Sequence, residues 1–158
     1  MKSIALLLAL ICPFAAAAAD VGAEKFVTLA APADVVALGT CMTADSAWDE
    51  QHRLIVTTVK FHATRYLKGA AGGTLTVRVL GGTVGNDGMR ASHAATLGVG
   101  EEALLFLRRS QFGPYFVIWG GVDGKMPVTL DALTGTRRVG PGLSVDEFSR
   151  RLNPAGAQ

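Results

Sequence analysis

Alternation of apolar and polar side chains dominates residues 54–68. From Ile55 to Leu67 every second residue is mostly apolar, whereas the intervening residues from Thr58 to Lys68 are polar. Successive side chains of a strand point to opposite faces, so this pattern predicts a long strand with one buried face. Residues 74–80 repeat the alternation after a glycine-containing turn at 69–73, and the two segments together predict a hairpin.

Further strands are expected on both sides of this hairpin. Their ranges are 34–43, 103–109, 115–122, 125–130 and 136–139. Residues 103–107 have no polar side chain, so they predict a central strand covered on both faces, and Trp119 is expected in the core. The strand at 136–139 is expected at a sheet edge, where Arg137 and Arg138 would discourage pairing with other molecules.

The end of the chain has a different pattern. Ser144 and Glu147 form a capping box, and apolar residues at helical spacing follow, so residues 144–152 predict a short helix. Five to seven strands, one of them unusually long, together with this helix predict a mainly β fold, a small OB-type barrel. Closure of the barrel would remove exposed strand edges, and a β-sandwich is the alternative.

The first residues have the pattern of a secretory signal peptide. Lys2 precedes an apolar run at residues 4–11, Pro13 follows, and small residues lead to a cleavage site after Ala19. The run is far shorter than the ~20 residues of a membrane span, so a transmembrane anchor is the weaker alternative. We therefore expect a periplasmic or secreted protein with a single domain at 20–158, ordered at 33–152, and no transmembrane anchor after cleavage.

Composition excludes several classes. Of the 158 residues, 49% are hydrophobic and 18% are charged, which excludes intrinsic disorder. The net charge of +2 is too small to indicate a nucleic-acid partner. After removal of the leader one cysteine remains, Cys41, which follows an apolar run and is expected to be buried; a reactive thiol is the alternative.

No constellation of residues indicates catalysis, a metal or a cofactor. His52 and His62 would lie about 33 Å apart on an extended strand, and no spacing of His or Cys matches a metal site. His62 lies on the polar face of its strand and is expected to be solvated. No nucleophile elbow is present, and the adjacent carboxylates of Glu101 and Glu102 would diverge on a strand.

Weak indications of a binding site gather in the glycine-rich segment 81–93, which is expected to be a long loop. Its residues Asp87, Arg90 and His93 are candidates for contact with a ligand, because functional side chains concentrate on loops held by a rigid frame. Trp48, in the polar connection at 45–53, is a candidate for partner contact; the alternative is that it covers one end of the barrel.

The order of several short segments resembles a family of exported bacterial proteins of unknown function. The segments are Val35–Thr40, Leu54–Thr58, Tyr66–Gly69, Val79–Thr83, Gly100–Leu107 and Gly124–Met126. A more distant, fold-level similarity is to the netrin-like domain, the OB-type barrel of the tissue inhibitors of metalloproteinases. Those inhibitors use an N-terminal cysteine to chelate zinc, but the expected N-terminus here is Asp20, so the resemblance transfers no inhibitory residue.

These observations favour an exported, non-catalytic β-barrel module that binds a protein or a cell-envelope component. Two alternatives stay open at this point. One is an inhibitor of a co-secreted protease, which rests on the fold analogy. The other is a small thiol-dependent hydrolase that uses Cys41 with a histidine.

Overall fold

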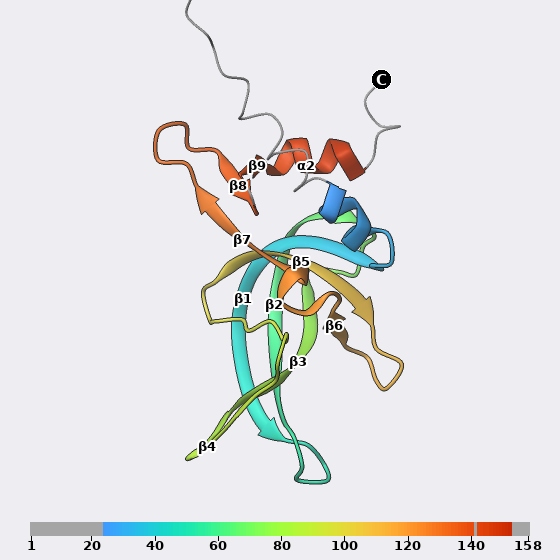
Figure 1. The fold of residues 1–158 in the computed structure, drawn as a ribbon, viewed down its shortest axis with the longest axis vertical. Coiled ribbons are helices and arrows are strands. Elements are labelled where there is room, and N and C mark those ends of the chain that lie inside the picture. The colour runs from blue at the N-terminus through green and yellow to red at the C-terminus, as the bar shows by residue number, and fades with distance from the viewer. Residues whose placement is uncertain (1–23, 141, 153–158) are drawn as a thin grey trace, which may run out of the picture.

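The computed structural model describes residues 24–140 and 142–152, and the predicted signal peptide lies outside this range (Figure 1). Residues 24–30 are helical. The elements that follow are β1 (Val35–Trp48), β2 (Ile55–Lys68), β3 (Thr74–Val84), β4 (Asp87–Arg90), β5 (Glu102–Arg109), β6 (Phe116–Ile118), the 3-10 helix η1 (Gly121–Gly124), β7 (Lys125–Leu130), β8 (Arg137–Val139), β9 (Leu143–Ser144) and α2 (Val145–Leu152).

Five strands close into a barrel. They pair in the order β1–β2–β3–β6–β5, and β5 pairs back onto β1. Every contact in this ring is antiparallel except that of β3 with β6, which is parallel and short, with Val77 opposite Phe116 and Arg78 opposite Val117. The prediction of a small β-barrel with a short C-terminal helix is confirmed.

The long strands bend to complete this ring. The pairing of β1 with β2 shifts register at three places along β1, and such bulges increase the local twist and bend of a strand. The first half of β1, from Val35 to Thr40, pairs with β5 on its other edge. Beyond Thr40, β1 has only β2 as a neighbouring strand among the described residues.

Strand β5 separates two hydrophobic clusters, which confirms that it is covered on both faces. Ala103, Leu105 and Leu107 point into the barrel and pack in the interior cluster. Leu104 and Phe106 point outward and join a second cluster beneath the helices. Burial of each large apolar side chain contributes about 1.5–3 kcal/mol, so both clusters stabilise the fold strongly.

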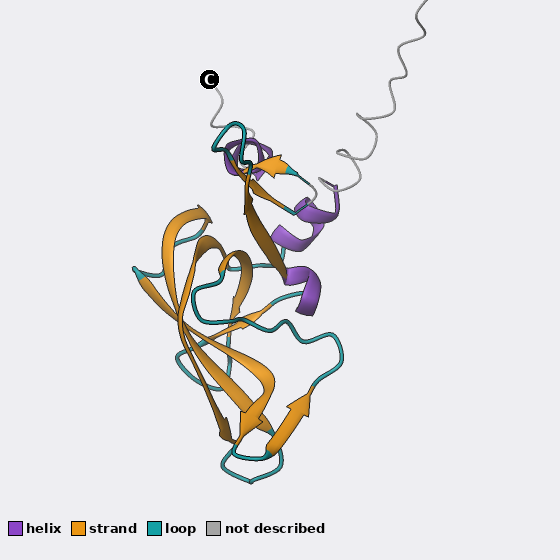
Figure 2. Ribbon diagram, turned by 90° about the vertical axis from the view of Figure 1, so that its left-hand side faces the viewer, coloured by secondary structure: helices purple, strands orange, loops and turns teal. Residues whose placement is uncertain are grey.

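The N-terminal helical segment and α2 lie at one end of the barrel, and the β3–β4 hairpin projects from the opposite end (Figures 1 and 2). Phe26 from the N-terminal helical segment and Phe148 from α2 are both fully buried in the outer cluster. Ser144 caps α2 as predicted, because its hydroxyl accepts a hydrogen bond from the Glu147 N–H (3.2 Å).

Several details of the sequence prediction are wrong. The connection expected at 45–53 is shorter, because β1 extends to Trp48, and the strand expected at 115–122 is limited to β6. The segment 81–93 is not one long loop, because Gly81–Val84 extends β3 and pairs with β4 around Gly85, whose φ of +59° suits a tight hairpin turn. The strand at 136–139 is not an edge, since β8 lies between β7 and β9. Trp119 is not in the core: β6 ends at Ile118, and the Trp119 side chain lies on the outer surface against Arg108.

Candidate functional site

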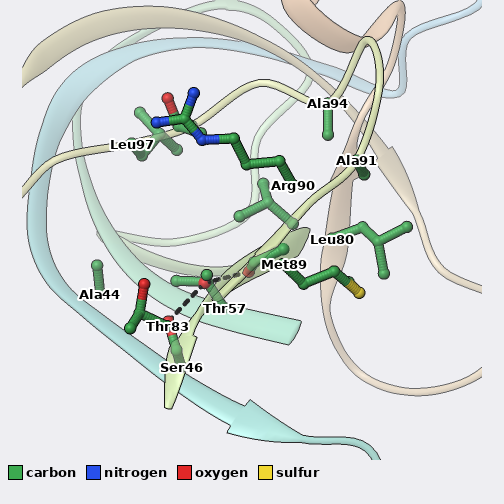
Figure 3. A pocket seen from close by; sticks show the side chains of 14 residues that line it. Ala44, Ser46, Thr57, Leu80, Thr83, Met89, Arg90, Ala91, Ala94 and Leu97 are labelled. Carbon is green, nitrogen blue, oxygen red and sulfur yellow. Dashed lines mark hydrogen bonds between the residues drawn. The ribbon is translucent and has the colours of Figure 1, made fainter. Parts of the chain in front are cut away.

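A cavity of about 590 Å³ opens where the closed part of the barrel ends (Figure 3). The strands β1 to β4 and the loop at residues 91–97 line it. Leu97 lines the cavity and also belongs to the interior cluster, and Ala44 and Val79 pack against that cluster while lining the cavity. The cavity is therefore the open continuation of the barrel interior.

Two glycines on β3 keep this space free of side chains. Gly81 and Gly82 have φ angles of +103° and +138°, a region that residues with a side chain rarely adopt. A Cβ at Gly82 would overlap the hydroxyl oxygens of Ser46 and Thr57. The glycines thus allow the β3 backbone to approach these two hydroxyl groups closely.

Ser46 and Thr57 face each other across β1 and β2 and form a directional pair of hydrogen bonds. The Thr57 hydroxyl donates to the Gly81 carbonyl oxygen (2.6 Å), and the oxygens of the two hydroxyls are 2.8 Å apart. A hydroxyl has one proton, and a carbonyl can only accept, so Ser46 must be the donor to Thr57. The Ser46 oxygen consequently keeps its own acceptor sites for a group inside the cavity.

Arg90, the last residue of β4, is the charged residue of the cavity lining. Its side chain is exposed, and it makes no hydrogen bond or ion pair with any residue in the described ranges. Figure 3 shows Arg90 on one side of the open space and the Ser46–Thr57 pair on the other. An unneutralised guanidinium at the mouth of a partly enclosed site attracts an anion, preferably a carboxylate or phosphate group.

Of the four predicted contact residues, the structure brings only Arg90 to the cavity. Trp48 is half-buried at the end of β1 and stacks on the His52 ring, with 5.6 Å between the ring centroids. Asp87 begins β4 and is exposed. His93 is exposed with a φ of +63°, and its carbonyl oxygen accepts a hydrogen bond from the Val122 N–H (2.9 Å).

Sequence reasoning missed Ser46 and Thr57. The signal for Thr57 was present, because it lies between Ile55 and Val59 on the apolar face of the long strand. Its side chain is 9% exposed and is the buried polar residue of the described core. A buried hydroxyl among apolar side chains needs a hydrogen-bond partner inside the fold, and the partners of Thr57 lie at the floor of the cavity.

An ion pair secures the wall of the cavity that carries Thr96 and Leu97. Lys125 Nζ donates to Glu101 Oε1 (2.6 Å) and to the Thr96 carbonyl oxygen (2.6 Å), and Glu101 also accepts the Gly98 N–H (2.9 Å). Partial burial acts to raise the pKa of Glu101, but the hydrogen bonds from Gly98 and Lys125 outweigh it, so the pKa is lowered. The carboxylate is therefore ionised and holds this loop against β7 at neutral pH.

The groups considered for catalysis do not converge on the cavity. The predicted burial of Cys41 is confirmed, since its side chain is 1% exposed in the barrel interior. Burial, with a smaller contribution from the Glu101 charge, raises the pKa of the Cys41 thiol. His62 is exposed as expected, and within residues 24–140 and 142–152 no group of three or more His, Cys, Asp or Glu could hold a metal ion.

Comparison with known proteins adds no family to this description. No protein-family model matches the chain, and no curated protein sequence is significantly similar to it. The OB-type assignment and the resemblance to netrin-like proteins therefore stay predictions. In the part of the chain that the structure describes, no helix has the length and apolar character of a bilayer span.

Proposed function

We propose that this protein is an exported, non-catalytic binding module, and that the cavity beside Arg90 receives a carboxylate-bearing part of a protein or cell-envelope component. The observation that carries the proposal is the combination of one unneutralised arginine with a lining of apolar, small and hydroxyl-bearing residues. Export itself rests on the signal-peptide pattern at residues 1–19.

The lining suggests how a ligand would be oriented. Its carboxylate would accept hydrogen bonds from the Arg90 guanidinium, and a ligand N–H or O–H would donate to the Ser46 oxygen. An apolar part would contact Val79 and Leu97, which border the interior cluster. A site of this kind, largely apolar with a few placed polar groups, is typical of small-ligand recognition.

The alternative of a thiol-dependent hydrolase has less support. A nucleophilic cysteine needs a lowered pKa and access to substrate, whereas Cys41 is buried and its pKa is raised. The protease-inhibitor alternative continues to rest on fold analogy, and no feature of the cavity favours it.

Thermal unfolding of the purified protein with matched ligand pairs tests the proposal. The pairs are hexanoate with hexanamide, benzoate with benzamide, and N-acetylalanine with its amide. At ten times its Kd, a ligand stabilises the fold by about 1.4 kcal/mol, which raises the Tm by about 3–6 °C in a domain of this size. We expect carboxylates to produce this shift and amides to produce little or none.

Two variants separate specific binding from general electrostatic attraction. Arg90→Gln should abolish the carboxylate effect, whereas Arg53→Gln, at the exposed turn between β1 and β2, should leave it intact. The proposed function is wrong if none of the carboxylates shifts the Tm, or if the Arg90→Gln protein responds like the wild type.

A further inference from the structure

Three exposed residues lie in one row on the outer wall of the barrel, and none of them lines the cavity. Arg78 on β3 is opposite Val117 on β6, and Val117 is opposite Arg108 on β5. Neighbouring strands are about 4.8 Å apart, so the backbones of the two arginines are about 10 Å apart across the sheet.

Each arginine is stacked on an aromatic ring beside Val117. The Arg78 guanidinium carbon is 4.6 Å from the centre of the Tyr115 ring, and that of Arg108 is 4.7 Å from the centre of the Trp119 ring. Tyr115 and Trp119 directly flank β6, and their contacts with Arg78 and Arg108 place both rings beside the row that contains Val117. We call these five residues the arginine–aromatic face. The stacking restrains the guanidinium groups, which lowers the entropy lost when a ligand binds them.

Both arginines lack an acidic partner among the described residues. Other arginines, such as Arg65 and Arg138, pair with carboxylates of the same chain. The Asp34 carboxylate, at the start of β1 beside the end of β5, instead accepts a hydrogen bond from the Arg109 N–H (2.7 Å). The two guanidinium groups of the face are therefore available to a carboxylate from outside the chain.

We propose that the arginine–aromatic face binds an acidic segment of a partner protein, with one carboxylate at Arg78, another at Arg108 and an apolar side chain over Val117. Arg, Tyr and Trp are the residues that dominate binding energy in protein interfaces, and the guanidinium fork matches a carboxylate. An anionic membrane surface is normally recognised by clusters of four to eight basic residues, and nucleic acid by a longer basic stripe. The charge of this face suits a protein better than either.

The spacing of the arginines predicts the sequence of the segment. Residues i and i+2 of an extended chain are about 7 Å apart, and residues i and i+4 are about 13 Å apart. A span of about 10 Å lies between these values, and the side chains adjust for the difference. We expect two acidic residues with one to three residues between them.

Selection from a displayed library of random 12-residue peptides tests this inference. Peptides enriched on the wild-type protein should carry the acidic pair, and their synthetic versions should bind with a Kd that fluorescence anisotropy can measure. Arg78→Gln and Arg108→Gln should each raise the Kd about tenfold. The lysine variants keep the charge but lose the fork, so they should recover only part of the affinity. Arg53→Gln, the matched surface control, should bind as the wild type does.

Several outcomes would overturn the inference. They are no enrichment above a selection on the Arg78→Gln/Arg108→Gln double variant, enriched peptides without acidic residues, and peptide binding that persists in the double variant. Arginine-dependent binding to phosphatidylglycerol vesicles or to dextran sulfate, without peptide binding, would replace a protein partner with a lipid or polysaccharide. Arg90→Gln should leave peptide binding intact, so the cavity and the arginine–aromatic face are tested separately.

Discussion

Replacement of Thr57 by valine tests the directional hydroxyl pair at the cavity floor. Valine has nearly the same shape, so the change mainly removes the hydrogen bond that Thr57 donates to the Gly81 carbonyl oxygen (2.6 Å). Gly81 is buried, and a buried acceptor without a partner costs about 1–3 kcal/mol. We expect the free energy of unfolding to fall by about 2 kcal/mol and the Tm by about 6 °C.

Ser46→Ala supplies the matched comparison. It removes the hydroxyl that donates to Thr57, but Thr57 can still donate to Gly81, and the vacated site faces the open cavity. The cost should therefore be smaller, about 0.5–1 kcal/mol. In the Thr57→Val background, Ser46→Ala should cost less still, because the hydrogen bond between the hydroxyls is already lost.

Urea unfolding of the wild type, the two single variants and the double variant, followed by circular dichroism, measures all four free energies. The proposed direction of the hydrogen bonds is wrong if Ser46→Ala destabilises the protein as much as Thr57→Val does. It is also wrong if the Thr57→Val protein has the same urea midpoint of unfolding as the wild type, since the hydrogen bond from Thr57 to the Gly81 carbonyl oxygen would then not contribute to stability.

Three further predictions concern the cavity wall, its glycines and the buried thiol. Because the pKa of Glu101 is lowered in the fold, its stabilising effect is present above its ordinary value of 4.5 and is lost as the pH falls through the lower, folded value. In urea unfolding, Glu101→Gln should cost about 1 kcal/mol at pH 7 and progressively less below pH 4.5; a pH-independent cost would contradict this. Gly82→Ala should lower the free energy of unfolding by about 2 kcal/mol more than Gly85→Ala does, because Gly85 also has a positive φ but has open space around it. Equal losses of stability in the two variants would show that the added methyl group at position 82 does not overlap the hydroxyls. Cys41 should react with a thiol reagent only as fast as the protein unfolds, and rapid modification of the native protein would show that it is accessible.

The features that the sequence predicted well are those with a repeating physical signal. Alternation at 54–68 predicted β2 because one face of that strand is in the barrel interior. The fully apolar run at 103–107 predicted a strand covered on both faces, and the capping box predicted α2. Each of these signals depends on burial or on a local hydrogen bond, and both can be inferred from residues that are close together in the sequence.

The features that the sequence did not predict depend on contacts between distant strands. Gly85 and Asn86 form a typical two-residue hairpin turn, but the surrounding glycines led to the prediction of a long loop. Arg90 was expected at a site, but its position opposite Ser46 follows from the pairing of β4 with β3 and of β1 with β2. Trp119 was expected in the core because it ends the apolar run at 115–119, but its ring is exposed and stacks on Arg108. The sequence alone does not distinguish such an exposed ring from a buried one.

A mismatch in strand length gives this barrel its open end. Strands β1 and β2 have 14 residues each and β3 has 11, whereas β5 has 8 and β6 has 3. Pairing with the shorter strands ends at Thr40 on β1, where β5 begins, and at Arg78 on β3, next to β6. Beyond these residues the long strands form a curved sheet that β5 and β6 no longer close. Bulky side chains would normally fill such a space, but many of the strand residues that line it are small or carry a hydroxyl (Ala44, Ser46, Thr57, Gly81, Gly82 and Thr83). The loop at 91–97 contributes the rest of the lining on its side. The row of Arg78, Val117 and Arg108 is the last one in which β6 connects β3 to β5. The same difference in strand length therefore positions both proposed binding surfaces. The arginine–aromatic face lies where the barrel is still closed, and the cavity begins where the barrel opens.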